Sequence, residues 1–225
     1  MLKEIRPNSH KLIQQFLLLQ DVSELLERDF DEFPFCPACT SSKSFFKFKK
    51  FELKFNQCKN CKTIFMNPRP SQDSMNKYYE TSRNYEYWAK NIFPSSASAR
   101  KDKICKPSLE RIKKTLKGIC NINKSSVLEI GPGFGIFAEL CTQEKIFRNY
   151  EVLEPTPSLA KHCKEIGLKV HEKSIESFKK IVSYDLIFAF EVLEHIYNPN
   201  NFLKKCNSLL NQNGILVISC PNGIG

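Results

Sequence analysis

The strongest constraint on the fold is a glycine-rich turn that joins a short apolar run to a helical pattern. Residues 127–130 (Val-Leu-Glu-Ile) predict a strand, and Gly131, Gly133 and Gly135 follow it directly, before a helical pattern near residues 136–145. Glycine lets the backbone turn tightly and lets a ligand approach without a Cβ in the way. A strand, a glycine turn and a helix in this order are typical of one unit of a parallel α/β sheet.

The same alternation of strand and helix patterns continues along the C-terminal half. The run at residues 184–190 is almost wholly apolar, as a buried parallel strand requires. Thr156 and Pro157 predict a helix start, and Asn213-Gly214 predicts a turn before the last strand. Repeated units of this length indicate a parallel sheet with right-handed crossovers. The further predicted strands are residues 150–154, 168–171, 184–190 and 215–219.

A carboxylate stands where an adenosine-containing ligand would need one. Glu154 ends the second predicted strand, 19 residues beyond Gly135, and can accept both ribose hydroxyls in charge-assisted hydrogen bonds of about 1.5–3 kcal/mol each. A dinucleotide fingerprint would require glycine at position 136, where Ile136 stands. Glu129, two residues before the first glycine, adds negative charge for a ligand ammonium. This pattern favours S-adenosylmethionine over a nicotinamide dinucleotide.

At this point the C-terminal half resembles the class I S-adenosylmethionine-dependent methyltransferases. Four motifs match in the family's order and spacing, and they cover roughly the last hundred residues. The resemblance implies an α/β, Rossmann-like parallel sheet with S-adenosylmethionine as cofactor. The matching runs are residues 127–135, 152–155, 184–195 and 214–222. The cofactor-binding positions expected from the residues and the resemblance are Glu129, Gly131, Gly133, Gly135, Glu154, Ser174, Ile175 and Glu191.

The chain departs from that family in two places. After the third strand the family usually has an acidic residue that touches the adenine amine, but Ser174 and Ile175 stand here. The family's sheet has seven strands, whereas this sequence ends after the fifth predicted one. We therefore expect a sheet truncated after the fifth strand, in a fragment of a longer chain.

The run Glu191-Val-Leu-Glu194-His195 follows the fourth predicted strand, at the sheet edge where open α/β sheets bind ligands. By resemblance, Glu191 lies near the cofactor and His195 near the incoming nucleophile, so His195 is the candidate catalytic base. An alternative is that His195 only pads the start of a helix. The run also resembles a metal-holding motif of RNA 3′-end methyltransferases, but no histidine follows His195 to complete it.

Four cysteines form two CxxC pairs, Cys36/Cys39 and Cys58/Cys61, separated by 18 residues. Such spacing is typical of a tetrahedral structural zinc ribbon, which would gain on the order of 10 kcal/mol from the metal. The competing interpretations are a redox dithiol and incidental cysteines. The other six cysteines are scattered, and the N-terminus resembles no secretory signal. We therefore expect a cytoplasmic protein in a reducing compartment.

These patterns predict four segments. They are an N-terminal amphipathic helix, a four-cysteine zinc-binding module, a basic helical linker and an S-adenosylmethionine-binding methyltransferase domain. A loop is expected in the linker near Pro94 to Ser98. The segments span residues 1–35, 36–70, 71–123 and 124–225.

The positive charge indicates an anionic partner. Of the formal net charge of +10, residues 36–125 carry +14, because 20 Lys and Arg stand against 6 Asp and Glu. The alternative is an ordinary solvated lysine surface. Because methyltransferases with a similar zinc module often act on sugars, we expect methyl transfer to a small or sugar-linked anionic acceptor.

A second function remains open from the sequence. A zinc-dependent nucleic-acid-binding protein with a vestigial methyltransferase domain would use the interleaved aromatic residues and lysines of residues 45–51 to stack bases. The same residues also fit amphipathic strands. Nothing in the sequence predicts an oligomeric state.

Overall fold

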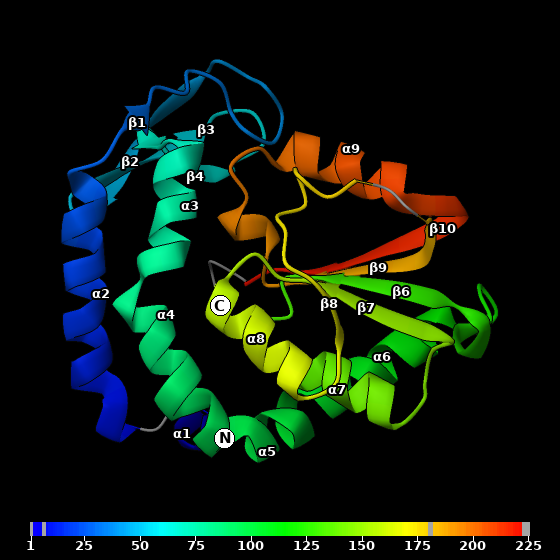
Figure 1. The fold of residues 1–225 in the computed structure, drawn as a ribbon. Coiled ribbons are helices and arrows are strands. Elements are labelled where there is room, and N and C mark those ends of the chain that lie inside the picture. Colours follow the sequence, from blue (N-terminus) through cyan, green and yellow to red (C-terminus); the bar gives the residue numbers. More distant parts are fainter. Residues whose placement is uncertain (1, 6–7, 180–181, 222–225) are drawn as a thin grey trace. The chain divides into compact units, whose positions relative to one another are not determined.

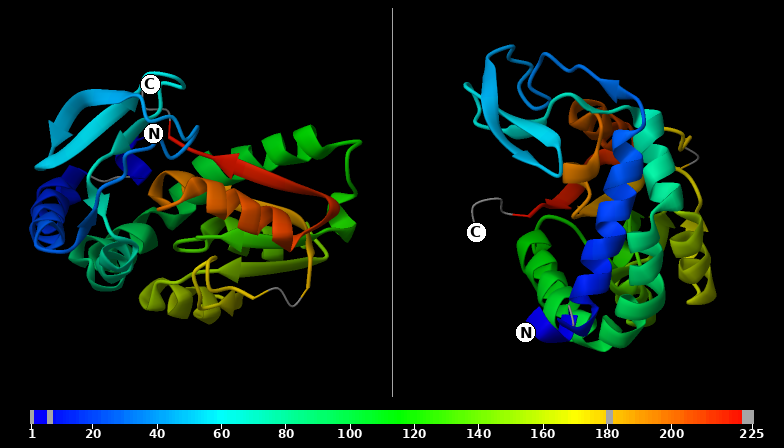
Figure 2. Two further views of the ribbon diagram at one scale, coloured as in Figure 1. Left: turned by 90° about the horizontal axis from the view of Figure 1, so that it is seen from above. Right: turned by 90° about the vertical axis from the view of Figure 1, so that its left-hand side faces the viewer.

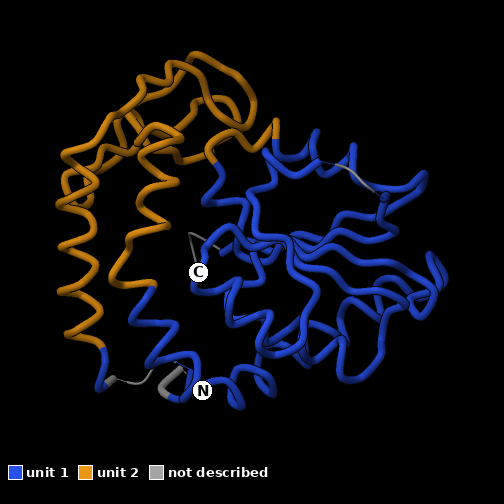
Figure 3. Tube along the Cα trace, in the orientation of Figure 1, with its two compact units in different colours: residues 1–10, 86–196, 202–225 blue, residues 11–85, 197–201 orange. Residues whose placement is uncertain are grey.

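Two compact units make up the computed structural model (Figure 3). The chain begins in unit 1 and passes through unit 2 twice before it ends in unit 1. The structure describes residues 2–5, 8–179 and 182–221. Unit 1 comprises residues 1–10, 86–196 and 202–225, and unit 2 comprises residues 11–85 and 197–201.

A five-stranded parallel sheet forms the centre of unit 1 (Figure 1). The strand order is β10-β9-β6-β7-β8, so the strand that precedes the glycine turn, β6, lies in the middle. This order confirms the predicted Rossmann-like α/β fold. The strands are β6 (Ser126–Ile130), β7 (Asn149–Leu153), β8 (Lys169–His171), β9 (Tyr184–Phe190) and β10 (Leu210–Ser219).

Helices cover both faces of this sheet (Figure 1). On one face, α6 (Lys106–Leu116) and α7 (Ile136–Gln143) pack on β6 and β9, and α8 (Pro157–Glu165) packs on β7. On the other face, α9 (Pro199–Leu209) buries Phe202 and Leu209 against the sheet. The alternating side chains of each buried strand supply both cores, which is why β6 and β9 are apolar almost throughout.

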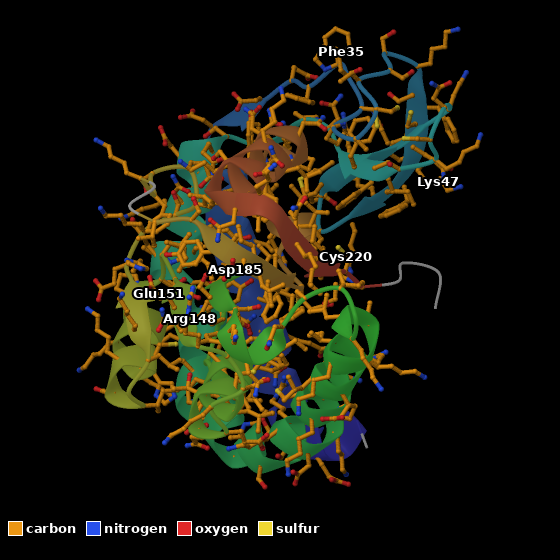
Figure 4. All side chains as sticks on the ribbon, turned by 90° about the vertical axis from the view of Figure 1, so that its right-hand side faces the viewer. Phe35, Lys47, Arg148, Glu151, Asp185 and Cys220 are labelled. Atoms are coloured by element: carbon orange, nitrogen blue, oxygen red, sulfur yellow. The ribbon has the colours of Figure 1, made fainter. Side chains whose placement is uncertain are left out.

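Asp185 ties the amino ends of three strands together (Figure 4). Its carboxylate accepts hydrogen bonds from Ser126 N at 2.8 Å and Asn211 Nδ2 at 2.7 Å, and Arg148 lies 3.6 Å away. Glu151 on β7 is also occupied, by Lys169 Nζ, Tyr184 Oη and His171 Nε2. These two carboxylates therefore hold the sheet together.

The segment before the sheet is helical almost throughout, and the loop predicted near Pro94 to Ser98 is wrong. Helix α5 (Phe93–Arg100) includes it, with Pro94 in the first turn, where proline's missing N–H is not needed. The flanking turns η2 (Trp88–Ile92) and η3 (Lys101–Cys105) are π-helical. The other short elements of unit 1 are α1 (Leu2–Ile5), η1 (Asn8–His10) and η4 (Ile122–Lys124).

Two local predictions in the sheet domain need correction. Strand β10 begins at Leu210, five residues before the predicted start, and the Asn213-Gly214 pair forms an irregularity within it, with Asn213 at φ 65°. Thr156 does precede α8, but its side chain makes no capping hydrogen bond. The last residue of the 214–222 motif lies outside the described residues.

Unit 2 is built around a small antiparallel sheet, order β2-β3-β4, and the two-stranded pair β1-β5 (Figure 2). Its helix α2 is fixed by the buried Asp21, whose carboxylate accepts hydrogen bonds from Ser82 Oγ, Arg83 N and Asn84 N at 2.6–3.0 Å. The strands are β1 (Phe30–Asp31), β2 (Ser44–Lys50), β3 (Leu53–Cys58), β4 (Ile64–Met66) and β5 (Arg69–Pro70). The helices are α2 (Lys11–Leu26), α3 (Gln72–Thr81) and α4 (Arg83–Tyr87), the last of which continues into unit 1.

Helix α2 buries Val22 and Leu25 and exposes Leu12, Phe16 and Leu19 on its other side. Among the described residues, no helix is both long and apolar enough to cross a membrane. The four segments predicted from the sequence differ from the two units defined by contacts, and that four-part division stays a prediction.

Candidate functional site

The glycine turn leaves its middle residue open. A Cβ at Gly131 would lie 2.9 Å from Val192 Cγ2, and one at Gly135 would lie 3.0 Å from Cys163 Sγ. A Cβ at Gly133, whose φ is 57°, would meet nothing within 4 Å. The protein's own packing therefore requires the outer two glycines, while the space beside Gly133 suits a ligand that approaches the backbone closely.

Glu154 lies directly against this turn. Its Oε2 accepts a hydrogen bond from Gly133 N at 3.2 Å, and its Oε1 accepts one from Thr156 N at 2.9 Å. Burial raises the pKa of Glu154, although these backbone donors oppose the shift. The structure thus brings together the bare backbone and the carboxylate that an adenosine ribose requires, and these groups fit S-adenosylmethionine.

Glu129 is buried beneath the turn. Its Oε2 accepts a hydrogen bond from Tyr150 Oη at 2.8 Å, and its residue is only 3% exposed. Burial raises the pKa of Glu129 to about 7, and the charge of Glu154 adds to that rise. The predicted role of Glu129 toward the cofactor ammonium stays a prediction.

The positions after β8 differ in their environment. Ile175 is buried in the core with Leu153 and Phe178. Ser174 is half-buried, and its Oγ accepts a weak hydrogen bond from Ser177 N at 3.4 Å. Only the Ser174 hydroxyl is thus a candidate polar contact here, whereas the Ile175 side chain is packed in the core.

Glu191 has an unusual backbone conformation at the carboxyl edge of the sheet. Its φ is 54°, a left-handed value that is uncommon for residues other than glycine and that recurs at functional sites. Ser219 stabilises it on both sides, because Glu191 N donates to Ser219 O and Ser219 Oγ donates to Glu191 Oε1, each at 2.9 Å.

His195 ends the short 3₁₀ helix η5 (Leu193–His195) that follows Glu191. Its side chain is 51% exposed, and its Nε2 lies 3.9 Å from Glu194 Oε1. The imidazole is thus accessible to an incoming substrate.

The sequence did not reveal the aromatic stack beside the turn. Phe134 stacks with His162 and with Phe93. The Phe134 ring centroid lies 3.7 Å from that of His162 and 5.1 Å from that of Phe93, and Arg100 lies over Phe93. The stack joins α5 to the glycine turn within unit 1. A residue's aromaticity alone does not identify its stacking partner, so the sequence carried no signal for it.

The four predicted cysteines form one cluster in unit 2. Their Sγ atoms all lie within 4.8 Å of one another, with Cys36 and Cys61 3.5 Å apart and Cys39 and Cys58 3.6 Å apart. Zinc with four thiolates at 2.3 Å would give sulfur–sulfur distances of about 3.8 Å. The cluster is therefore confirmed, and its geometry can hold a zinc ion with no open coordination position.

The two cysteine pairs adopt the same backbone turn. Thr40 N donates to Cys36 O and Lys62 N donates to Cys58 O. Thr40 and Lys62, each directly after a second cysteine, both have positive φ. This repeated turn directs both sulfur atoms of each pair toward the same cluster.

Comparison with known proteins agrees with this geometry. The sequence model of a family described as a methyltransferase domain matches residues 96–223, which is more than half of the chain. The chain belongs to this methyltransferase domain family. The matched region starts within α5 and includes the glycine turn, Glu154 and His195.

The methyltransferase domain has bacterial relatives named ubiquinone biosynthesis O-methyltransferase. The protein of Rickettsia canadensis is 30% identical over 106 residues, which are 45% of this chain and 45% of the relative. That of Histophilus somni is 31% identical over 111 residues, or 45% of this chain and 47% of the relative. The chain thus spans about half the length of the curated relatives it matches.

Solved structures are similar at lower identity. The DhpI–SAH complex gives a TM-score of 0.48 at 16% identity and covers 65% of this chain and 67% of that one. The sugar N-methyltransferase KedS8 from Streptoalloteichus gives a TM-score of 0.44 at 15% identity. The match covers 49% of this chain and 46% of that one. The strand order of unit 1 establishes the fold without these comparisons.

We predict that the purified protein contains one zinc ion per chain, measured by elemental mass spectrometry. The Cys36→Ser variant should lose the metal and unfold unit 2, because this unit has only a small core around Cys36, Cys58 and Phe65. The control Cys220→Ser, an exposed cysteine outside the cluster, should keep it. Unchanged thermal unfolding of the metal-free Cys36→Ser variant would contradict this role.

A second prediction separates backbone strain from ligand binding. Gly133→Ala and Gly118→Ala each place a Cβ on a residue with positive φ, in open space, and each should lower the free energy of unfolding by about 1 kcal/mol. Calorimetry should show weaker S-adenosylhomocysteine binding, by at least tenfold, for Gly133→Ala alone. Equal affinities of the two variants would show that the ligand does not approach Gly133.

Proposed function

We propose that the chain binds S-adenosylmethionine across the glycine turn and transfers its methyl group to a hydroxyl of a small or sugar-linked anionic acceptor. The observation that carries this proposal is the contact of Glu154 with Gly133 N, which joins an acceptor for ribose hydroxyls to an open stretch of backbone. Membership in the methyltransferase domain family supports it.

Each cofactor-binding residue has a distinct task in this proposal. When bound, S-adenosylmethionine supplies a methyl group activated by its sulfonium. Glu154 accepts hydrogen bonds from the ribose, and Glu129 and Glu191 supply negative charge toward the amino acid part. Ser174 and Ile175 flank the adenine. Because methyl transfer is an in-line displacement, binding and orientation provide most of the catalysis.

His195 is the proposed base. With S-adenosylmethionine bound, the imidazole would take the proton of the acceptor hydroxyl as its oxygen attacks the activated methyl group. The accessible side chain of His195 supports this role. The relatives named as O-methyltransferases support oxygen as the accepting atom. The charge of +14 in residues 36–125 supports an anionic acceptor.

A reducing, cytoplasmic location belongs to the same proposal. The six cysteines outside the metal cluster form no disulfide in the described residues, and Cys105, Cys141, Cys163 and Cys206 are buried in unit 1. Burial raises the pKa of Cys105 to about 12, so this thiol stays protonated and inert.

Nucleic-acid binding is the second candidate function, and strand β2 favours it. Phe46 is 60% exposed, Phe45 is 43% exposed, and Lys47 (labelled in Figure 4) lies between Phe46 and Phe48. Exposed rings between lysines can stack bases. Oligonucleotide binding that weakens steeply with salt, without S-adenosylmethionine binding, would favour this function over the enzyme.

We predict that Glu154→Gln weakens S-adenosylmethionine binding at least tenfold in titration calorimetry, because a neutral amide loses the charge-assisted bonds to the ribose. Glu151→Gln is the matched control on the same strand, because the Glu151 carboxylate is occupied by Lys169, Tyr184 and His171. If both variants bind like the parent protein, the proposed cofactor site is wrong.

The same site predicts a pH dependence. Because burial raises the pKa of Glu154, its carboxylate should be protonated, and cofactor affinity lost, at a higher pH than for an exposed glutamate. Affinity should therefore fall as the pH is lowered, and Glu154→Gln should flatten this profile. A flat profile in the parent protein would contradict the role of the ionised carboxylate.

We predict that His195→Asn lowers S-adenosylhomocysteine formation at least 100-fold while leaving S-adenosylmethionine affinity unchanged. The assay uses mass spectrometry with a panel of catechols, sugar phosphates and nucleotide sugars. His10→Asn is the control, because His10 bonds Tyr87 Oη instead. A panel acceptor turned over equally fast by His195→Asn would remove His195 from the mechanism.

A further inference from the structure

Five residues in the second half of the chain belong to unit 2 rather than to their neighbours' unit. Residues 197–201 lie between residues 86–196 and 202–225 in the sequence, both of which belong to unit 1. This short segment follows His195 after a single residue, Ile196. Unit 2 therefore holds the chain directly beyond the proposed base (Figure 3).

Tyr197 is held by a guanidinium group that lies over two aromatic rings. The Cζ of Arg69 lies 3.9 Å from the ring centroid of Tyr197 and 3.7 Å from that of Phe33, and the two rings are tilted 72° to each other. A cation over an aromatic ring is favourable, because the ring presents its negative face to it. We call Phe33, Arg69 and Tyr197 the clamp.

Polar contacts fix the same segment from two other points. Tyr197 Oη donates to Asp31 Oδ2 at 2.5 Å, and Asp31 pairs with Arg69 in the register of β1 and β5. Asn200 Nδ2 donates to Pro37 O at 2.9 Å, between the first two cysteines of the metal cluster. Strand pairing and the cysteine turn thus hold residues 197–201 in one place within unit 2.

Arg69 is held in the clamp at an electrostatic cost. Arg69 Nε and Nη2 are buried and have no hydrogen-bond partner among the described residues. Buried donors without partners are unfavourable, so an ordinary packing role would be met better by an apolar side chain.

The other end of the same loop is also anchored. Glu191 N donates to Ser219 O, and Ser219 Oγ donates to Glu191 Oε1. Between this anchor and Tyr197, His195 N donates to Val192 O in the 3₁₀ turn. The loop that carries His195 is therefore short and internally bonded, with Glu191 bonded within unit 1 and Tyr197 bonded within unit 2.

We propose that Tyr197, held by Arg69 and Asp31, is a positioning residue for His195. The inference rests on the proposed function of His195 and assigns unit 2 a task in the reaction. By restraining the loop, the clamp reduces the number of orientations that the imidazole explores, and a misplacement of about 1 Å can cost 100-fold in rate. The cofactor contacts at Glu154 and Gly133 do not involve the clamp.

Three measurements on the full-length variants Arg69→Ala and Tyr197→Ala test this proposal. Hydrogen exchange of peptides covering residues 191–201 should be at least tenfold faster than in the parent protein. S-adenosylhomocysteine formation, with the acceptor found in the panel, should fall 10- to 100-fold in kcat. The S-adenosylmethionine dissociation constant and the Michaelis constant for this cofactor should stay within twofold.

Arg83→Ala is the matched control. Arg83 is an arginine of unit 2 that pairs with Asp21 and Glu24 rather than with residues 197–201. Its loss should lower the stability of unit 2 without changing exchange in residues 191–201 or kcat. A general loosening of unit 2 would instead affect Arg83→Ala and Arg69→Ala alike, and that result would overturn the proposal.

Conservative variants separate stacking from charge. Tyr197→Phe keeps the ring and loses the bond to Asp31, so it should recover most of the kcat lost in Tyr197→Ala. Arg69→Lys keeps the charge without a planar face and should remain as slow as Arg69→Ala. Full activity of Arg69→Lys would overturn the stacking argument.

Failure of the proposed function has a different signature. If the parent protein binds no S-adenosylmethionine, the methyltransferase assignment fails, whereas hydrogen exchange still reports whether the clamp restrains the loop. If cofactor binding and turnover are intact but exchange in residues 191–201 is unaffected by Arg69→Ala, the clamp proposal alone is wrong.

Discussion

The contact between the Glu154 carboxylate and Gly133 N is the constraint on which the cofactor site depends. It requires β7 to lie beside β6 in parallel, so that the end of one strand meets the turn after the other. Gly133 has a φ of 57°, which favours glycine, and the space beside its Cα is open to a ligand. The apolar packing of β6, α7 and α8 supports the contact between Glu154 and Gly133, because it fixes the end of β7 and the turn after β6 at one edge of the sheet.

The two sides of the proposed reaction are held by different means. On the cofactor side, the glycine turn follows a strand of the parallel sheet. Phe134 in that turn stacks with Phe93 and His162. On the proposed acceptor side, Ser219 holds the Glu191 end of the loop within unit 1. Unit 2 has little apolar core and needs a further source of stability. The four thiolates of the cysteine cluster supply that stabilisation when they bind metal.

Much of this architecture could be predicted from local patterns. The glycine turn, the apolar run of β9 and the strand–helix alternation predicted the parallel sheet. Hydrophobic periodicity and the positions of turn-forming residues are local properties of a chain and can be read from its sequence. The spacing of Cys36, Cys39, Cys58 and Cys61 predicted their cluster for the same reason. Errors arose where a local signal has two meanings. Pro94 ends many helices but starts this one, and the Asn213-Gly214 pair forms an irregularity within a strand rather than the turn before it.

The sequence by itself determined the fold class, the identity of the cysteine cluster and the carboxylate that faces the glycine turn, because each depends on neighbours in sequence or on regular strand pairing. Only the tertiary structure decided that Tyr197 stacks on Arg69, that Ser219 supports Glu191 and that Glu129 is buried beside Tyr150. These contacts join residues 21 to 128 positions apart, and many other pairings of the same residue types are chemically equivalent. Which of them forms is set by how whole elements pack, since the free energy of packing depends on all the side chains at once.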